Sequence, residues 1–144
     1  MTRRFLLDTN VLSELAKPAP DPVVAKRLSS AAHEIVTAAV CWRELRYGME
    51  RLPPSRRKTE LVVYLDEILR TVPILAYDAS AAEWDARERA RLEVAGRTPS
   101  PTDAQIASVA CTQGLVLVTR NVRDFSAFEG LIVENWHPRA RRSR

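Results

Sequence analysis

The chain has 144 residues, which suits one domain with a hydrophobic core of its own. Hydrophobic residues make up 46% of the chain and charged residues 28%, which excludes a disordered protein. The net charge is +4, and only three of the 22 basic residues are lysines, an arginine-rich balance that is compatible with a polyanionic partner. No apolar run reaches the roughly 20 residues of a membrane span, and residues 1–10 lack signal-peptide features, so we expect a cytoplasmic protein.

Short apolar runs of strand length alternate along the chain with longer segments that have helical spacing. The predicted strands are 4–7, 34–39, 71–77, 115–120 and 131–136. The predicted helices are 9–15, 21–31, 40–52, 56–70, 78–96 and 102–114, and 121–130 is a predicted loop with one helical turn. This alternation predicts an α/β fold with a mostly parallel sheet.

Several of the predicted helices carry residues typical of helix ends. Asp21 precedes a proline at a favoured early position, and Ser55 and Asp78 stand where they can cap the next helices. Gly96 suits the end of the helix that Asp78 begins.

Four acidic residues lie close to the ends of predicted elements. Asp8 follows the first strand, Glu44 lies in the helix after the second, and Asp103 opens the helix before the fourth. Asp124 follows the fourth strand, with Asn121 between them. In an open α/β sheet the ligand crevice lies at the carboxyl ends of the strands, where these residues can meet. Clustered carboxylates repel one another unless a cation neutralises them, and their hard oxygens suit Mg²⁺ or Mn²⁺.

Each acidic residue also has a purely structural interpretation. Asp8 can be the N-cap of the helix that follows it. Asp103 lies three residues after Ser100, a spacing close to that of a capping box. Glu44 alone is an ordinary helix carboxylate, and Asp124 alone is a turn residue. The functional interpretation therefore depends on the whole set.

The cysteines and histidines do not predict a zinc site. Cys41 and Cys111 lie within apolar helical patterns and form no CxxC pair, so we expect buried thiols. His33 and His137 stand far apart, without a Cys or His partner at ligand spacing.

Four stretches, "LLDTNVLSEL", "RELRYG", "PTDAQIASVA" and "LVTRNVRDF", together resemble the PIN-domain ribonucleases that form the toxins of VapBC-type toxin–antitoxin modules, FitB-like proteins included. They occur in the order of that family and span nearly the whole chain. The resemblance implies a PIN-like α/β fold, with a central, mostly parallel sheet flanked by helices in three layers. It implies one PIN domain over residues 1–136, followed by a basic C-terminal tail at 137–144.

The resemblance also assigns the acidic site. Asp8, Glu44 and Asp103 match three acids of the family. The fourth position is open between Asn121, where some members carry an acid, and Asp124. The residues expected to support the site are Asn10, Thr119 and Asn121, and those expected to bind RNA phosphates are Arg46, Arg120 and Arg123.

By the same resemblance the chain is a Mg²⁺-dependent endoribonuclease, with Mn²⁺ as the alternative ion. Asp8 and Asp103 would hold the ion directly, with Glu44 and Asp124 acting through water. The implied partners are an RNA substrate, a second copy of the chain in a homodimer, and a small VapB-like antitoxin that blocks the crevice.

Two other functions compete with this one. A PIN-like scaffold or RNA-binding module could keep the fold without catalysis, although all four acidic positions are filled. A phosphatase-like hydrolase also carries an Asp after its first strand. That class needs a second Asp two residues later, where this chain has Asn10. It also needs a Lys late in the chain, whereas no Lys follows Lys58.

Overall fold

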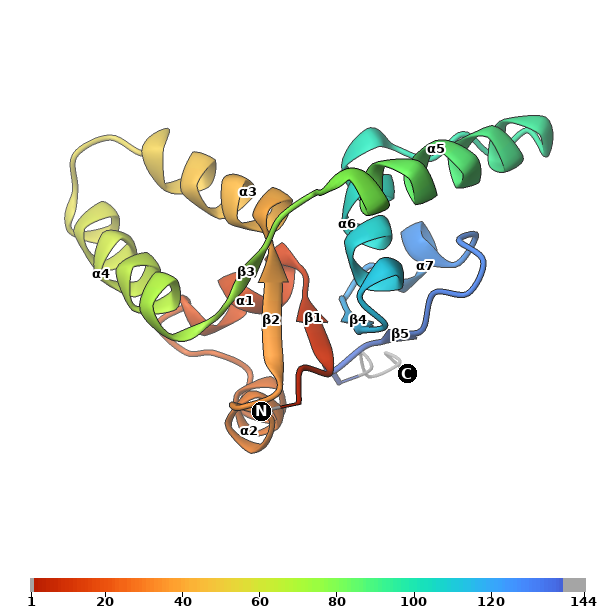
Figure 1. Cartoon of the computed structure of the whole chain (residues 1–144). Coiled ribbons are helices and arrows are strands. Elements are labelled where there is room, and N and C mark those ends of the chain that lie inside the picture. The colour runs from red at the N-terminus through yellow and green to blue at the C-terminus, as the bar shows by residue number, and fades with distance from the viewer. Residues whose placement is uncertain (1, 139–144) are drawn as a thin grey trace, which may run out of the picture.

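The computed structural model describes residues 2–138 and contains one five-stranded sheet in the order β3-β2-β1-β4-β5 (Figure 1). All four strand pairings are parallel, which confirms the predicted α/β class. The strands are β1 Phe5–Leu7, β2 Ile35–Ala38, β3 Ile74–Leu75, β4 Val116–Val118 and β5 Val133–Glu134.

Helices cover both faces of this sheet. They are α1 Thr9–Leu15, α2 Pro22–Ser30, α3 Ala39–Glu50, α4 Arg56–Thr71, α5 Ala79–Val94, α6 Pro101–Thr112 and α7 Val122–Phe125. In Figure 1, α3 and α4 lie in the left part of the picture, and α5, α6 and α7 lie in the right part. The short helix α7 falls in the segment expected to be a loop with one helical turn.

The alternation of side chains along β1 divides the core in two. Leu6 packs with residues of α5 and α6, whereas Phe5 and Leu7 pack with residues of α1, α2 and α4. All three side chains are buried, as expected for a strand at the centre of a sheet with both faces covered. The predicted three layers are therefore present, with α3 contributing to both halves of the core.

The edge strands are shorter than predicted. The predicted strand 71–77 is reduced to Ile74–Leu75, and 131–136 to Val133–Glu134. An edge strand pairs on one side only, so fewer hydrogen bonds extend it. Beside β3, Pro73 also has no N–H to donate, which limits the pairing to its carbonyl, an acceptor for Thr37 N–H at 3.0 Å. The predicted caps Ser55 and Asp78 are correct, since each accepts a hydrogen bond from a backbone N–H in the first turn of its helix. Asp21 caps α2 in the same way.

The order of the strands creates a switch point beside β1. The chain passes from β1 to β2 and β3 on one side, and then crosses to β4 on the other. Leu7 is in register with Val118, so Asp8 and Thr119 leave neighbouring strands at the same edge of the sheet. Ligands of open α/β sheets bind at such points, which places the predicted acidic crevice there.

Of the predicted basic tail, residues 139–144 lie outside the described part of the chain, which ends at Pro138. Between residues 2 and 138, no helix is long and apolar enough to cross a membrane.

Candidate functional site

A polar cavity of about 560 Å³ opens at the carboxyl ends of β1 and β4. Its walls come from the first turn of α1, from α3, from the start of α6 and from the loop after β4. The ten lining residues are Asp8, Thr9, Asn10, Ser13, Arg43, Glu44, Thr102, Asp103, Ile106 and Asn121. Three of the four predicted carboxylates therefore share one cavity, although they are far apart in the sequence.

Asp8 is the most constrained of these carboxylates. It is 5% exposed, and its Oδ1 accepts Thr9 N–H at 2.7 Å as the N-cap of α1. Its Oδ2 accepts the Thr119 hydroxyl at 2.8 Å across the β1–β4 switch point. The prediction that Asp8 caps the helix is correct, and the same side chain also forms a wall of the cavity. The structural and functional interpretations of Asp8 are therefore compatible.

A small hydrogen-bond network fastens the loop after β4 to α1. Thr119 is fully buried, and its hydroxyl oxygen accepts Asn121 N–H at 3.0 Å and the Asn10 side-chain amide at 3.3 Å. Asn10 Oδ1 in turn accepts Arg120 N–H at 3.1 Å. Asn10, Thr119 and Asn121, predicted to support the site, thus all lie in this network beside Asp8. Their functional roles stay predictions.

A buried thiol lies beneath Asp8. Burial, followed by the negative charge of Asp8, raises the pKa of Cys41 to about 12, so this thiol stays protonated. Its S–H donates weakly to Asp8 Oδ1 at 3.7 Å. Both cysteines are free, as expected, with Cys41 buried and Cys111 half-buried.

The carboxylates of the cavity influence one another electrostatically. Burial raises the pKa of Glu44, and the charges of Asp8 and Asp103 raise it further, against the opposing charge of Arg43. Burial likewise raises the pKa of Asp103; a hydrogen bond with Ser100 opposes this, and the charges of Asp124 and Asp8 add to it. The cavity therefore carries more negative charge than its own residues neutralise.

Asp124 occupies a different position from the other three acids. It is exposed on α7 and is not among the residues that line the cavity, whereas Asn121 is. Its charge nevertheless reaches Asp103. The structure thus places Asn121 in the wall and Asp124 outside it, and it leaves open which of them serves as the fourth site residue.

The donor set fits a hard divalent cation. Within residues 2–138, no three His, Cys, Asp or Glu side chains are close enough to form a complete ligand cluster. The carboxylates instead surround an open space, which suits Mg²⁺ because that ion retains several waters and takes only one or two protein carboxylates. Their mutual repulsion is what such a cation would relieve.

The arginines predicted to grip phosphate do not line the cavity. Arg46 forms an ion pair with Glu50 at 3.1 Å on the surface of α3, and Arg120 and Arg123 are exposed on the loop and helix after β4. The arginine that does line the cavity is Arg43, which the sequence analysis missed. The available signals were its position next to Glu44 and its place at the start of the motif "RELRYG".

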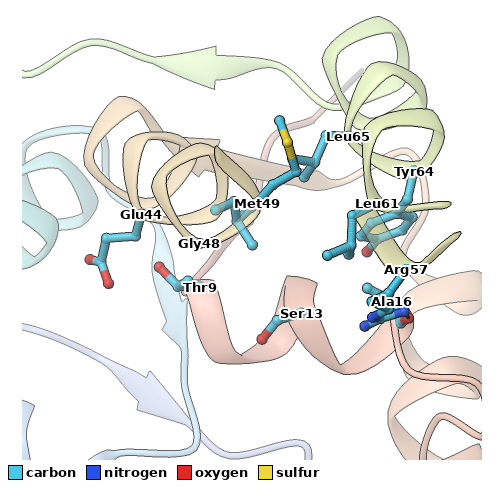
Figure 2. Close-up of a pocket in the computed structure, with 11 residues that line it drawn as sticks. Thr9, Ser13, Ala16, Glu44, Gly48, Met49, Arg57, Leu61, Tyr64 and Leu65 are labelled. Atoms are coloured by element: carbon cyan, nitrogen blue, oxygen red, sulfur yellow. Dashed lines mark hydrogen bonds between the residues drawn. The ribbon is translucent and has the colours of Figure 1, made fainter. Parts of the chain in front are cut away.

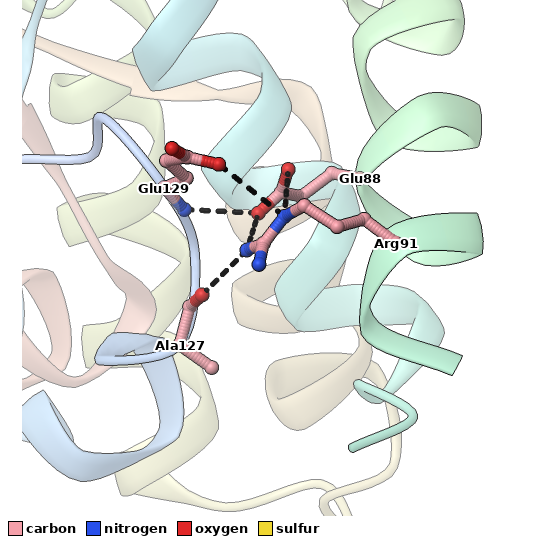
Figure 3. Close-up of polar contacts among 4 residues, drawn as sticks. All are labelled: Glu88, Arg91, Ala127 and Glu129. Atoms are coloured by element: carbon pink, nitrogen blue, oxygen red, sulfur yellow. Dashed lines mark hydrogen bonds and ion pairs between the residues drawn. The ribbon is translucent and has the colours of Figure 1, made fainter. Parts of the chain in front are cut away.

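The segment after α7 is held in place by α5 (Figure 3). Glu88 accepts Glu129 N–H at 2.9 Å and forms an ion pair with Arg91, which donates to the Ala127 carbonyl at 3.0 Å. Helix α5 therefore holds the loop that follows the helix carrying Asp124, without itself reaching the cavity.

An apolar groove adjoins the acidic cavity (Figure 2). It lies between α1, α3 and α4, and Thr9, Ser13 and Glu44 line both the groove and the cavity. In Figure 2, Glu44 and Thr9 lie at one end of the groove and Arg57 at the other. A molecule bound in the groove would therefore reach the edge of the acidic site.

The fold and the acidic cavity together are those of a PIN-type protein, and a model of the PIN domain matches residues 5–131. The chain belongs to the PIN-domain family. It is 32% identical over 133 residues to a protein of Shigella flexneri named tRNA(fMet)-specific endonuclease VapC, covering 92% of this chain and 98% of that one. It is 30% identical over 137 residues to the Toxin FitB of Neisseria gonorrhoeae, covering 92% and 99%.

Among solved structures, the chain resembles DNA-bound VapBC from Salmonella typhimurium, with a TM-score of 0.84 and 29% identity. The match covers 94% of this chain and 100% of that one. The resemblance to VapC and FitB toxins that the four sequence motifs predicted is thus confirmed.

We predict that Asp103→Ala does not destabilise the metal-free protein. The helix cap is the Ser100 hydroxyl, which accepts Asp103 N–H at 3.1 Å, and the Asp103 carboxylate is repelled by its neighbours. Urea unfolding in chelator should therefore give Asp103→Ala an unchanged or higher free energy of unfolding. Ser100→Ala, the control, should lose about 1 kcal/mol. An equal loss in both variants would contradict the account.

We predict that Glu88 makes stability depend on pH in the acid range. Its hydrogen bonds with Arg91, then with Glu129 N–H, outweigh burial and lower the pKa of its carboxyl. A lowered pKa in the folded state adds stability that is complete above the ordinary value of 4.5 and is lost as the pH falls below it.

The free energy of unfolding should thus fall between about pH 5 and pH 3, and the fall should be shallower in Glu88→Gln. Glu83→Gln, an exposed change on the same helix, is the control and should retain the wild-type profile. Identical profiles for wild type and Glu88→Gln would exclude this role for Glu88.

Proposed function

We propose that the chain is a Mg²⁺-dependent endoribonuclease that hydrolyses RNA phosphodiester bonds and acts as the toxin of a toxin–antitoxin pair. The observation that carries this proposal is the meeting of Asp8, Glu44 and Asp103, from three separate elements, in one open polar cavity. The relatives named as VapC ribonucleases match the chain over nearly its full length, which supports the same activity. Mn²⁺ is the alternative ion, since it shares the preference for oxygen ligands.

Asp8 and Asp103 would hold the ion directly, with Glu44 and Asp124 acting through water molecules. When bound, the ion supplies a water of lowered pKa and neutralises charge that develops on the phosphoryl oxygens. No side-chain nucleophile is needed for this hydrolysis, which accords with the protonated state of Cys41, the cysteine beside the cavity.

The residues around Asp8 would orient its carboxylate for this task. Two short hydrogen bonds, from Thr9 N–H at 2.7 Å and from the Thr119 hydroxyl at 2.8 Å, fix the plane of the carboxylate. The contacts from the Asn10 amide at 3.4 Å and from the Cys41 thiol at 3.7 Å are long and weak, so electron pairs remain for a cation. Fixing a ligand in advance lowers the cost of ordering it when the ion binds.

The proposed partners are RNA, a small VapB-like antitoxin and a second copy of the chain. We assign the antitoxin to the apolar groove between α1, α3 and α4, because an occupant of this groove reaches Glu44. Tyr47 on α3 and Val63 and Leu69 on α4 are exposed apolar side chains, which supports a homodimer interface on these helices. The cytoplasm, where RNA is abundant, is the proposed site of action. Arg46, Arg120 and Arg123 remain proposed as weaker contacts to RNA phosphates.

The decisive experiment is incubation of purified, antitoxin-free protein with total RNA in Mg²⁺, in Mn²⁺ and in chelator. Wild type should release discrete fragments only with metal. Asp8→Asn should reduce cleavage at least about 100-fold, because changes to residues that merely support metal ligands already cost 10–100-fold. Asp66→Asn, an exposed change on α4, is the control and should cleave normally. A folded wild type that cleaves nothing with either metal would favour a non-catalytic RNA-binding module instead.

A further inference from the structure

Among the residues that the structure describes, one cationic side chain lies in the wall of the acidic cavity. Among the ten residues that line the cavity, Arg43 is the only Arg or Lys, and three of the others are carboxylates. The remaining polar lining residues are neutral hydroxyls and amides. A guanidinium among carboxylates suggests either internal neutralisation or recognition of an external anion, and its contacts decide between the two.

Arg43 is not used in an internal ion pair. Among the described residues, eight ion-pair contacts join basic to acidic side chains, and none of them involves Arg43. Arg46, on the same helix, is bound to Glu50 at 3.1 Å. Arg43 is instead exposed at the edge of the cavity, so its donors are available to a ligand.

The position of Arg43 also separates it from the apolar groove. Glu44 lines both the groove and the cavity, whereas Arg43 lines the cavity alone. Thr102 and Asp103, in the first turn of α6, likewise line the cavity and not the groove. The part of the cavity wall formed by Arg43 and the start of α6 therefore combines a guanidinium without an ion pair with residues that the groove does not share.

We propose that Arg43 binds a backbone phosphate of RNA beside the phosphodiester that is cut, as the strand enters between α3 and the start of α6. This inference rests on the proposed ribonuclease function. A cavity whose charged side chains were all carboxylates would repel a polyanion. A guanidinium, by contrast, offers two parallel N–H donors to the oxygens of one phosphate. Arg43 thus attracts the strand at the edge of a site whose carboxylates are reserved for the cation.

The test is RNA binding in the Asp8→Asn background, which prevents cleavage, with Mg²⁺ present. The probes are unfractionated transfer RNA and a fluorescent 20-nucleotide single-stranded RNA of mixed sequence, titrated over a range of salt concentrations. Adding Arg43→Ala should weaken RNA binding roughly tenfold. This is the lower end of the loss of affinity expected when a hydrogen bond to a charged group is removed. The slope of log affinity against log salt should become less steep by about 0.7, the value for one contact to a single-stranded phosphate.

Two further variants separate charge from geometry. Arg43→Lys should keep the salt slope, because it keeps the charge, while losing part of the affinity with the bidentate contact. Arg70→Ala removes a charge from the exposed surface of α4, and it should change neither the affinity nor the slope. Circular dichroism establishes that each variant is folded.

Three results would overturn the inference. Unchanged affinity and slope in folded Arg43→Ala would exclude a phosphate contact. If Arg43→Ala binds Mg²⁺ more tightly when Asp8 is intact, and RNA binding is unchanged, Arg43 is an internal neutraliser of the carboxylates instead. If wild type with Arg43 intact cleaves no RNA with either metal, the proposed function itself fails, and the inference fails with it.

Discussion

The hydrogen bond from the Thr119 hydroxyl to the Asp8 carboxylate is the interaction on which the rest of the site depends. It joins the ends of the two central strands, β1 and β4, at the switch point of the sheet. The same carboxylate begins α1 by accepting Thr9 N–H. One buried acid thus caps a helix, anchors a loop and forms a wall of the cavity, so the helix cap and the proposed metal ligand can be the same side chain.

The second constraint is repulsion between carboxylates that the fold brings together. Asp8 and Asp103 both raise the pKa of Glu44, and within the described chain Arg43 is the only lining residue of opposite charge. Such an arrangement costs stability when no cation is present, and folds retain such costs mainly where function requires them. The apolar groove shares Glu44 with the cavity, so a partner bound in the groove could contact one of the carboxylates that repel one another.

Much of this could be predicted because local sequence determines it. The apolar run of β1, the caps Ser55 and Asp78, and the strand-end position of Asp8 are all local features, and the structure contains them. The lengths of the edge strands depend on pairing that no local pattern encodes. Arg43 was missed because neighbours on a helix point in different directions, so proximity to Glu44 in sequence did not show that it lines the cavity. The Glu88 contact with Glu129 N–H joins residues 41 positions apart and left no sequence signal.

The central claim is that the cavity around Asp8 holds a divalent cation. Calorimetric titration of Mn²⁺ and Mg²⁺ into the antitoxin-free protein tests it without any RNA. The account predicts saturable binding that is abolished in Asp8→Asn and unchanged in Asp66→Asn, whose substitution lies on the surface of α4. Saturable binding that survives in Asp8→Asn, or no binding by a folded wild type, would contradict it.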